Sequence, residues 1–174
     1  MDSLCPMTAA ETDRAFLRHT LATLAYRAEK ALRAQPPAFG EVRAGPASRS
    51  ALEIVGHLGD LMEWGERVAR GDTRWAPGAT ADWNAAVDRF FAALAAFDAA
   101  IAGPQFAADR ALVAFQGPIA DALTHIGQLS LLRGLADAPV RPESYARADI
   151  RAGRVGREQS TVRSEFDGDA SKRR

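Results

Sequence analysis

Apolar residues recur at intervals of three and four along most of the chain, which is the pattern of helices that bury one face. The pattern predicts four long helices, over residues 9–34, 51–70, 82–102 and 118–136. A regular alternation of apolar and polar positions, which would predict strands, is missing. Helices of this length span about 30 Å at about 1.5 Å per residue. The sequence therefore predicts an all-α fold, specifically a four-helix bundle.

Residues that favour helix starts precede each apolar pattern. Pro118 suits the first position of the last helix, because the N–H that proline lacks would have no partner there. Ser or Thr followed three residues later by Glu is a capping box, in which each residue caps the other's backbone N–H. The capping residues expected at the other three helices are Thr8 with Glu11, Ser50 with Glu53, and Thr80 or Asp82.

The chain divides into a bundle and two further segments. Residues 1–139 contain the four helical patterns. Residues 140–156 are rich in arginine, but Tyr145 and Ile150 could fix this arm to the bundle. Residues 157–174 are charged with few large apolar side chains, a composition typical of disorder. We expect a docked arm followed by a disordered tail.

Composition narrows the class of protein. Apolar residues make up 47% of the chain and charged residues 25%, and 22 basic residues balance 22 acidic ones. This balance gives no basic surface for nucleic acid at the level of the whole chain. No apolar run is long enough to span a membrane, no signal peptide is evident, and the single cysteine, Cys5, cannot form an internal disulfide. We expect a cytoplasmic protein that binds neither nucleic acid nor membranes.

Candidate chemistry lies in two apolar helical patterns. Asp121 and His125 are four residues apart, so they lie on one face of the last helix. His57 lies within the second helix and could face this pair across the core. Two histidines and one carboxylate can hold a divalent metal and leave positions open for a ligand. Asp60 and Gln128 each follow a candidate histidine by three residues and could orient its ring.

Simpler interpretations stand beside the metal hypothesis. Asp121 and His125 could form only a hydrogen-bonded helical pair, and His57 could be a buried histidine with a local partner. Tyr26 and Glu29 on the first helix are further candidates to line the same cavity. Arginine residues of the arm, Arg147 and Arg151 among them, could bind an anionic cofactor or could be solvated surface groups.

Three features together resemble a known family. The segment Ser50-Ala-Leu-Glu-Ile-Val-Gly-His57-Leu resembles the pattern that carries a metal-binding histidine in the DinB-like, or YfiT-like, four-helix bundles. The segment His125-Ile-Gly-Gln-Leu is similar to the His-x-Gly-Gln segment of their last helix, and a long Pro/Gly loop between the first two helices is also typical. The resemblance covers residues 10–137. Asp121 stands where the commoner pattern has histidine, and the maleylpyruvate isomerase branch is similar in having a carboxylate, Glu, there.

The family includes bacillithiol transferases and mycothiol-dependent maleylpyruvate isomerases. The resemblance implies a metal site of His57, Asp121 and His125 holding zinc, or another divalent ion such as nickel or iron. It further implies an S-transferase or isomerase in which a low-molecular-weight thiol attacks a small electrophile, and a homodimer. The alternative function is a non-catalytic helical bundle that dimerises or binds a partner and keeps a vestigial polar cluster.

Overall fold

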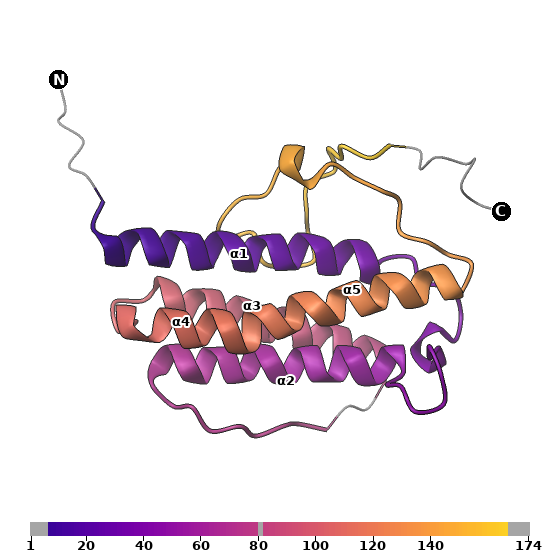
Figure 1. Cartoon of the computed structure of the whole chain (residues 1–174), viewed down its shortest axis with the longest axis horizontal. Coiled ribbons are helices and arrows are strands. Elements are labelled where there is room, and N and C mark those ends of the chain that lie inside the picture. The colour runs from indigo at the N-terminus through magenta and orange to yellow at the C-terminus, as the bar shows by residue number, and fades with distance from the viewer. Residues whose placement is uncertain (1–6, 80–81, 167–174) are drawn as a thin grey trace.

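A computed structural model describes residues 7–79 and 82–166 of the chain (Figure 1). Within these residues the only β pairing is an isolated bridge between Glu143 and Glu165. The predicted all-α bundle is therefore confirmed. Its elements are α1 (Ala9–Leu32), α2 (Ala51–Arg70), α3 (Trp83–Ala102), α4 (Ala111–Ala114), a π-helical segment (Phe115–Ile119) and α5 (Ala120–Leu135), with short 3-10 turns at Phe39–Glu41, Ala108–Arg110 and Tyr145–Arg147.

The helices do not simply alternate in direction. α1 and α5 run one way, and α2 and α3 both run the other way, so α2 and α3 are parallel neighbours (Figure 1). The residues between them return along the length of α2. Contacts at the two ends agree with this order, because Arg110 near the start of α4 donates to the carbonyl of Ala69 at the end of α2. The connection between α2 and α3 therefore lies beside α2 rather than at one end of the bundle.

Most of the predicted helix ends are found. Both capping boxes form, Thr8 with Glu11 and Ser50 with Glu53. Asp82 caps α3 by accepting from the backbone N–H of Ala85. Thr80, the alternative cap, and Cys5 lie outside the described residues.

The predicted start of the last helix at Pro118 is wrong. The chain is already helical from Ala111, and Pro118 lies inside the π-helical segment that joins α4 to α5. A wider π turn is one way in which a helix continues past a residue that has no N–H to donate. The segment also packs closely against α2, because a Cβ added at Gly117 would lie 2.8 Å from the Trp64 ring.

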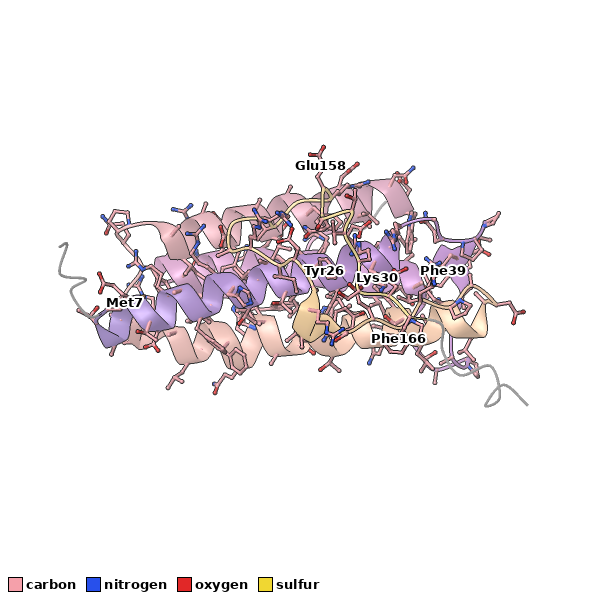
Figure 2. All side chains as sticks on the ribbon, turned by 90° about the horizontal axis from the view of Figure 1, so that it is seen from above. Met7, Tyr26, Lys30, Phe39, Glu158 and Phe166 are labelled. Atoms are coloured by element: carbon pink, nitrogen blue, oxygen red, sulfur yellow. The ribbon has the colours of Figure 1, made fainter. Side chains whose placement is uncertain are left out.

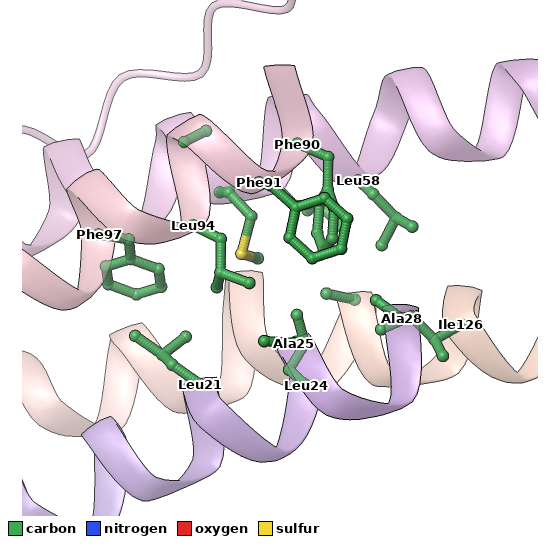
Figure 3. Close-up of a cluster of buried hydrophobic side chains, with 14 of the residues drawn as sticks. Leu21, Leu24, Ala25, Ala28, Leu58, Phe90, Phe91, Leu94, Phe97 and Ile126 are labelled. Atoms are coloured by element: carbon green, nitrogen blue, oxygen red, sulfur yellow. The ribbon is translucent and has the colours of Figure 1, made fainter. Parts of the chain in front are cut away.

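Apolar side chains from all the long helices form one core, and Figure 3 shows its central part. Phe90, Phe97 and Leu94 of α3 are fully buried against α2 and α1. α2 approaches α3 so closely that a Cβ added at Gly65 would lie 2.3 Å from the Phe97 ring. No helix in the described parts of the chain combines the length and the apolarity needed to cross a membrane.

The C-terminal segment lies along α1 and is more extensive than the sequence predicts (Figures 1 and 2). Ile150 packs against the core as predicted, and the Tyr145 ring meets the Tyr26 ring edge-on, with centroids 6.3 Å apart. The disorder expected from residue 157 does not begin there, because residues 157–166 also contact α1. Residues 167–174 lie outside the described part of the chain.

A buried polar cluster holds this segment. Glu143 accepts hydrogen bonds from the Tyr26 hydroxyl at 2.5 Å and from the Lys30 ammonium at 2.5 Å. Glu165 lies 3.0 Å from the same ammonium, and Arg163 pairs with Glu29 at 2.7 Å. Figure 2 shows Tyr26 and Lys30 beneath the segment. Tyr26, Glu29 and Lys30 of α1 thus contact residues of this segment rather than line the candidate metal cavity.

Candidate metal centre

The three predicted ligands meet between α2 and α5. Nε2 of His57 lies 3.5 Å from one carboxylate oxygen of Asp121, and Nε2 of His125 lies 3.4 Å from the other. The two imidazole rings are perpendicular, with centroids 4.8 Å apart. One ligand atom from each of the three residues can be chosen so that all lie within 4.8 Å of one another. The side chains of Asp121 and His125, four residues apart on α5, therefore meet that of His57 on α2, as the sequence predicts.

The two His–Asp distances are longer than ordinary hydrogen bonds, and each histidine faces a different oxygen of Asp121. An N–H donor and a carboxylate oxygen in a hydrogen bond are about 2.7–3.2 Å apart, and both His–Asp separations exceed that range. Two ligand atoms that each lie about 2.0–2.2 Å from one tetrahedral ion are about 3.3–3.6 Å apart. The donor set of two imidazoles and a carboxylate also suits zinc and similar divalent ions. The donor types thus fit such an ion, while the ligand atoms, at up to 4.8 Å from one another, are more widely spaced than around one bound tetrahedral ion.

Gln128 orients His125. Its side-chain oxygen lies 2.7 Å from Nδ1 of His125, and an amide oxygen can only accept a hydrogen bond. Nδ1 therefore carries the proton in the neutral ring, and Nε2 presents a lone pair to the carboxylate of Asp121. Two acceptors that face each other at 3.4 Å have no favourable contact unless a cation or a proton lies between them. Gln128 thus contacts the ring that the sequence predicts it to orient.

The surroundings of His57 favour its neutral imidazole. Burial, followed by the positive charge of Arg49, lowers the pKa of His57 below its usual value, although Asp121 acts in the opposite direction. Trp75, from the connection between α2 and α3, meets the His57 ring edge-on at a centroid distance of 5.8 Å. A neutral imidazole is the form that binds a metal.

Asp60, the other predicted orienting residue, has different partners. Its carboxylate accepts from Arg89 of α3 at 2.6 Å and from the backbone N–H of Gly78 at 2.8 Å. Arg89 also pairs with Glu63. Asp60 therefore ties the α2–α3 connection to the bundle, and its effect on His57 is indirect, through the position of that connection.

The arginines predicted to bind an anionic cofactor lie elsewhere. Arg147 and Arg151 belong to the C-terminal segment over α1, and neither lines the cavities beside the three candidate ligands. Arg151 pairs instead with Asp149 at 2.8 Å. Tyr26 and Glu29 also lie under that segment. The structure does not bring these four residues to the candidate metal centre.

Arg49 is the residue that the sequence analysis missed. It precedes the cap of α2, and its Nη1 lies 3.5 Å from Nε2 of His125. It lines two cavities on either side of the candidate ligands, one of about 430 Å³ that includes His57 and one of about 410 Å³ that includes His125. Because Arg49 directly precedes the capping box at Ser50, the sequence does predict that it lies at the start of α2.

Comparisons with known proteins do not identify the chain: no family model, curated protein or solved structure matches it.

Proposed function

We propose that this chain is a metal-dependent enzyme of the DinB-like superfamily, which joins a low-molecular-weight thiol to a small electrophile or isomerises that electrophile with the help of the thiol. The observation that carries the proposal is the convergence of His57, Asp121 and His125, whose ligand atoms lie within 4.8 Å of one another. The residues resembling the family motifs, on α2 and α5, are the ones that carry this cluster.

The chain's own residues would hold the ion and its surroundings. His57, Asp121 and His125 would bind it, and Gln128 would keep the His125 ring in the tautomer that binding requires. When bound, a divalent ion lowers the pKa of a coordinated thiol, and the thiolate is the nucleophilic form. Trp75 and Leu52 supply apolar walls to the cavity beside His57, which would limit water around a reacting thiol.

Charge is consistent with this proposal. The three ligands contribute one formal negative charge, so a divalent ion would leave the site net positive and suited to an anionic sulfur ligand. No Ser–His–Asp or Cys–His set is visible in the described residues, where the third histidine, His19, is exposed on α1. A mechanism in which the small-molecule thiol is the nucleophile needs no such set.

Metal binding is tested first. Zinc is titrated into metal-free protein by calorimetry, and cobalt binding is followed by visible absorption. We expect one ion per chain, and we expect His57→Ala, Asp121→Ala and His125→Ala each to weaken binding by about tenfold or more, in line with loss of a ligand. His19→Ala is the matched control and should bind like the wild type. Stoichiometric binding that survives all three ligand substitutions would refute the site.

Thiol chemistry is tested next. Zinc-loaded protein is mixed with 1-chloro-2,4-dinitrobenzene and a panel of small thiols, and chloride release is measured against the same mixture with His57→Ala. Thiol-dependent acceleration by the wild type alone supports the proposal. Zinc binding without acceleration for any thiol or for other electrophiles would leave a metal site and remove the proposed transferase activity.

The second candidate function is a non-catalytic bundle that forms a homodimer. It is favoured by apolar side chains exposed on α1 and the α4 region, where Phe16 is 60% and Leu112 is 78% exposed. Phe16 also contacts the ring of Phe115 at a centroid distance of 6.1 Å. Light scattering of the wild type and Leu112→Glu tests it, since a dimer packed on this face should dissociate in the variant. A homodimer is compatible with the enzyme proposal, so metal binding together with thiol-dependent activity decides between the two functions.

A further inference from the structure

Arg49 is a cation beside the site with no carboxylate of its own. Neighbouring arginines are paired, Arg43 with Glu53 at 2.9 Å and Arg89 with Asp60 at 2.6 Å. In the described parts of the chain no acidic side chain forms an ion pair with Arg49, and its side-chain contact is the weak one to Nε2 of His125 at 3.5 Å. Its guanidinium is thus available to an anion from solution.

A divalent ion at the proposed metal centre would repel the Arg49 guanidinium and so favour an anion between them. Arg49 lies 3.5 Å from the nitrogen that would bind a divalent ion, so two cations would be close neighbours. With Asp121 as the one anionic ligand, the guanidinium and a divalent ion would leave two positive charges uncompensated. An anionic group that lies beside both cations would remove this repulsion.

The cavity on the His125 side indicates what such a ligand looks like. It is about 410 Å³ in volume, and Ile54, Leu131 and Leu132 give it apolar walls. Ser48 and Gln128 add neutral polar groups. No second lysine or arginine is among the described residues that line either cavity. A single guanidinium matches a monoanion better than a phosphate, and the planar fork of arginine matches a carboxylate.

We propose that Arg49 binds the carboxylate of a small, partly apolar carboxylic acid, which lies in the cavity formed by the α1–α2 connection and α5. This inference deepens the proposed function, on which it rests, because it names the substrate class of the same site. The carboxylate faces Arg49, and the apolar body packs on Leu131 and Leu132.

The test compares carboxylates with neutral amides of the same shape. Benzoate is paired with benzamide, and 4-methylpentanoate with 4-methylpentanamide, and binding to metal-free and zinc-loaded protein is measured by calorimetry at pH 8. A hydrogen bond to a charged group contributes about 1.5–3 kcal/mol, which corresponds to a preference of about tenfold or more for at least one carboxylate. In Arg49→Met this preference should fall below about threefold, and Arg49→Lys should retain part of it.

Arg43→Met is the matched control. It removes the same charge from the same connection, so it should keep the wild-type preference, and circular dichroism verifies that all variants are folded. Loss of the preference in Arg43→Met as well as Arg49→Met would assign the effect to the connection and overturn the proposal. Equal binding of acid and amide by the wild type, no binding of either acid up to about 10 mM, or an unchanged preference in Arg49→Met would also overturn it.

The same titrations separate the two proposals. If zinc does not bind, the proposed function fails, and the metal-free comparison still decides whether Arg49 recognises carboxylates. If zinc binds at His57, Asp121 and His125 but no carboxylate is preferred, only the inference about Arg49 fails.

Discussion

The ion pair between Lys30 and Glu143 offers a sharp test of how the C-terminal segment is held. Nζ of Lys30 lies 2.5 Å from one Glu143 oxygen and 3.0 Å from Glu165, and the side chains of Lys30 and Glu143 are 1% and 0% exposed. The perturbation is Lys30→Met, which keeps a long apolar stem inside α1 and removes the charge. Glu143 would then remain buried without a cationic partner in direct contact.

The burial of Lys30 and Glu143 allows the loss of stability in Lys30→Met to be estimated. Breaking a buried ion pair by removing one partner costs about 3–5 kcal/mol, because an uncompensated charge remains. Glu143 would keep hydrogen bonds from the Tyr26 hydroxyl and the Ser164 backbone, so the lower end is appropriate. A loss of about 3 kcal/mol lowers the Tm of a domain of this size by about 6–12 °C. The assay is thermal and urea unfolding followed by circular dichroism.

Arg33→Met is the control for this substitution. Arg33 also pairs with Glu165, at 3.2 Å, but its side chain is 45% exposed. Exposed ion pairs contribute about 0–1 kcal/mol, so the control should change Tm by no more than a few degrees. The reasoning is refuted if Lys30→Met destabilises the protein no more than Arg33→Met does.

Acid should weaken the same contact. Burial raises the pKa of Glu143, but the hydrogen bonds from Lys30 and Tyr26 outweigh it, and the net shift is downward from 4.5. A carboxyl with a lowered folded-state pKa contributes stability that is present above its unfolded pKa and lost as pH falls through its folded pKa. Stability should therefore fall as pH decreases below about 4.5. Glu143→Gln should show a shallower fall over the same range.

Two further predictions concern packing and ionisation. Gly65→Ala should lower the free energy of unfolding by about 1–3 kcal/mol by overpacking, because the new Cβ would meet the Phe97 ring at 2.3 Å. Gly127→Ala should instead raise it by about 0.5–1 kcal/mol, because nothing lies within 4 Å of the new Cβ. Urea unfolding curves of the two variants measure both changes. Burial and the contact with Glu143 raise the pKa of Tyr26 to about 12, so its absorbance change in a Tyr145→Phe variant should have its midpoint there. Because this folded-state pKa is raised, the stability that the neutral phenol contributes should be lost as pH rises from about 10 through about 12.

The bundle and the three candidate ligands could be predicted because both depend on local spacing. Asp121 and His125 share a face of α5 whatever the start of that helix, so the error at Pro118 did not displace them. The capping box at Ser50 fixes where α2 begins, and His57 follows two turns later. Such relations are set by helix geometry and can be calculated from the sequence alone.

The partners of Asp60 and Arg49 could not be predicted in the same way. Asp60 accepts from Arg89, which belongs to a different helix and is 29 residues away in sequence. Whether the Asp60 carboxylate contacts His57 or Arg89 depends on the register in which α2 packs against α3. Close contacts such as that of Gly65 with the Phe97 ring help to set this register. Arg49 lies in a connection, where no periodicity indicates the direction of a side chain.

The order of residues 157–166 does not follow from their composition, because it depends on contacts with α1. Residues 157–166 have few large apolar side chains and would not bury a core alone. α1 supplies what they lack, since Tyr26 and Lys30 are buried polar residues on a helix whose other buried positions are apolar. Buried polar groups are nearly always hydrogen-bonded, so polar residues on the apolar face of a helix favour a polar partner there. That signal was present at Tyr26 and Lys30, four residues apart.

The direction of α3 links the fold to the candidate site. Because α2 and α3 run parallel, the chain must return along the whole of α2 before α3 can begin (Figure 1). The return brings Trp75 against His57 and places Gly78 where its N–H reaches Asp60. A Cβ at Gly78 would lie 2.5 Å from Arg89, so glycine lets the backbone approach the Asp60–Arg89 pair. A connection required by the topology thus also forms one wall of the cavity beside the ligands, and Asp60 binds that connection through the backbone of Gly78.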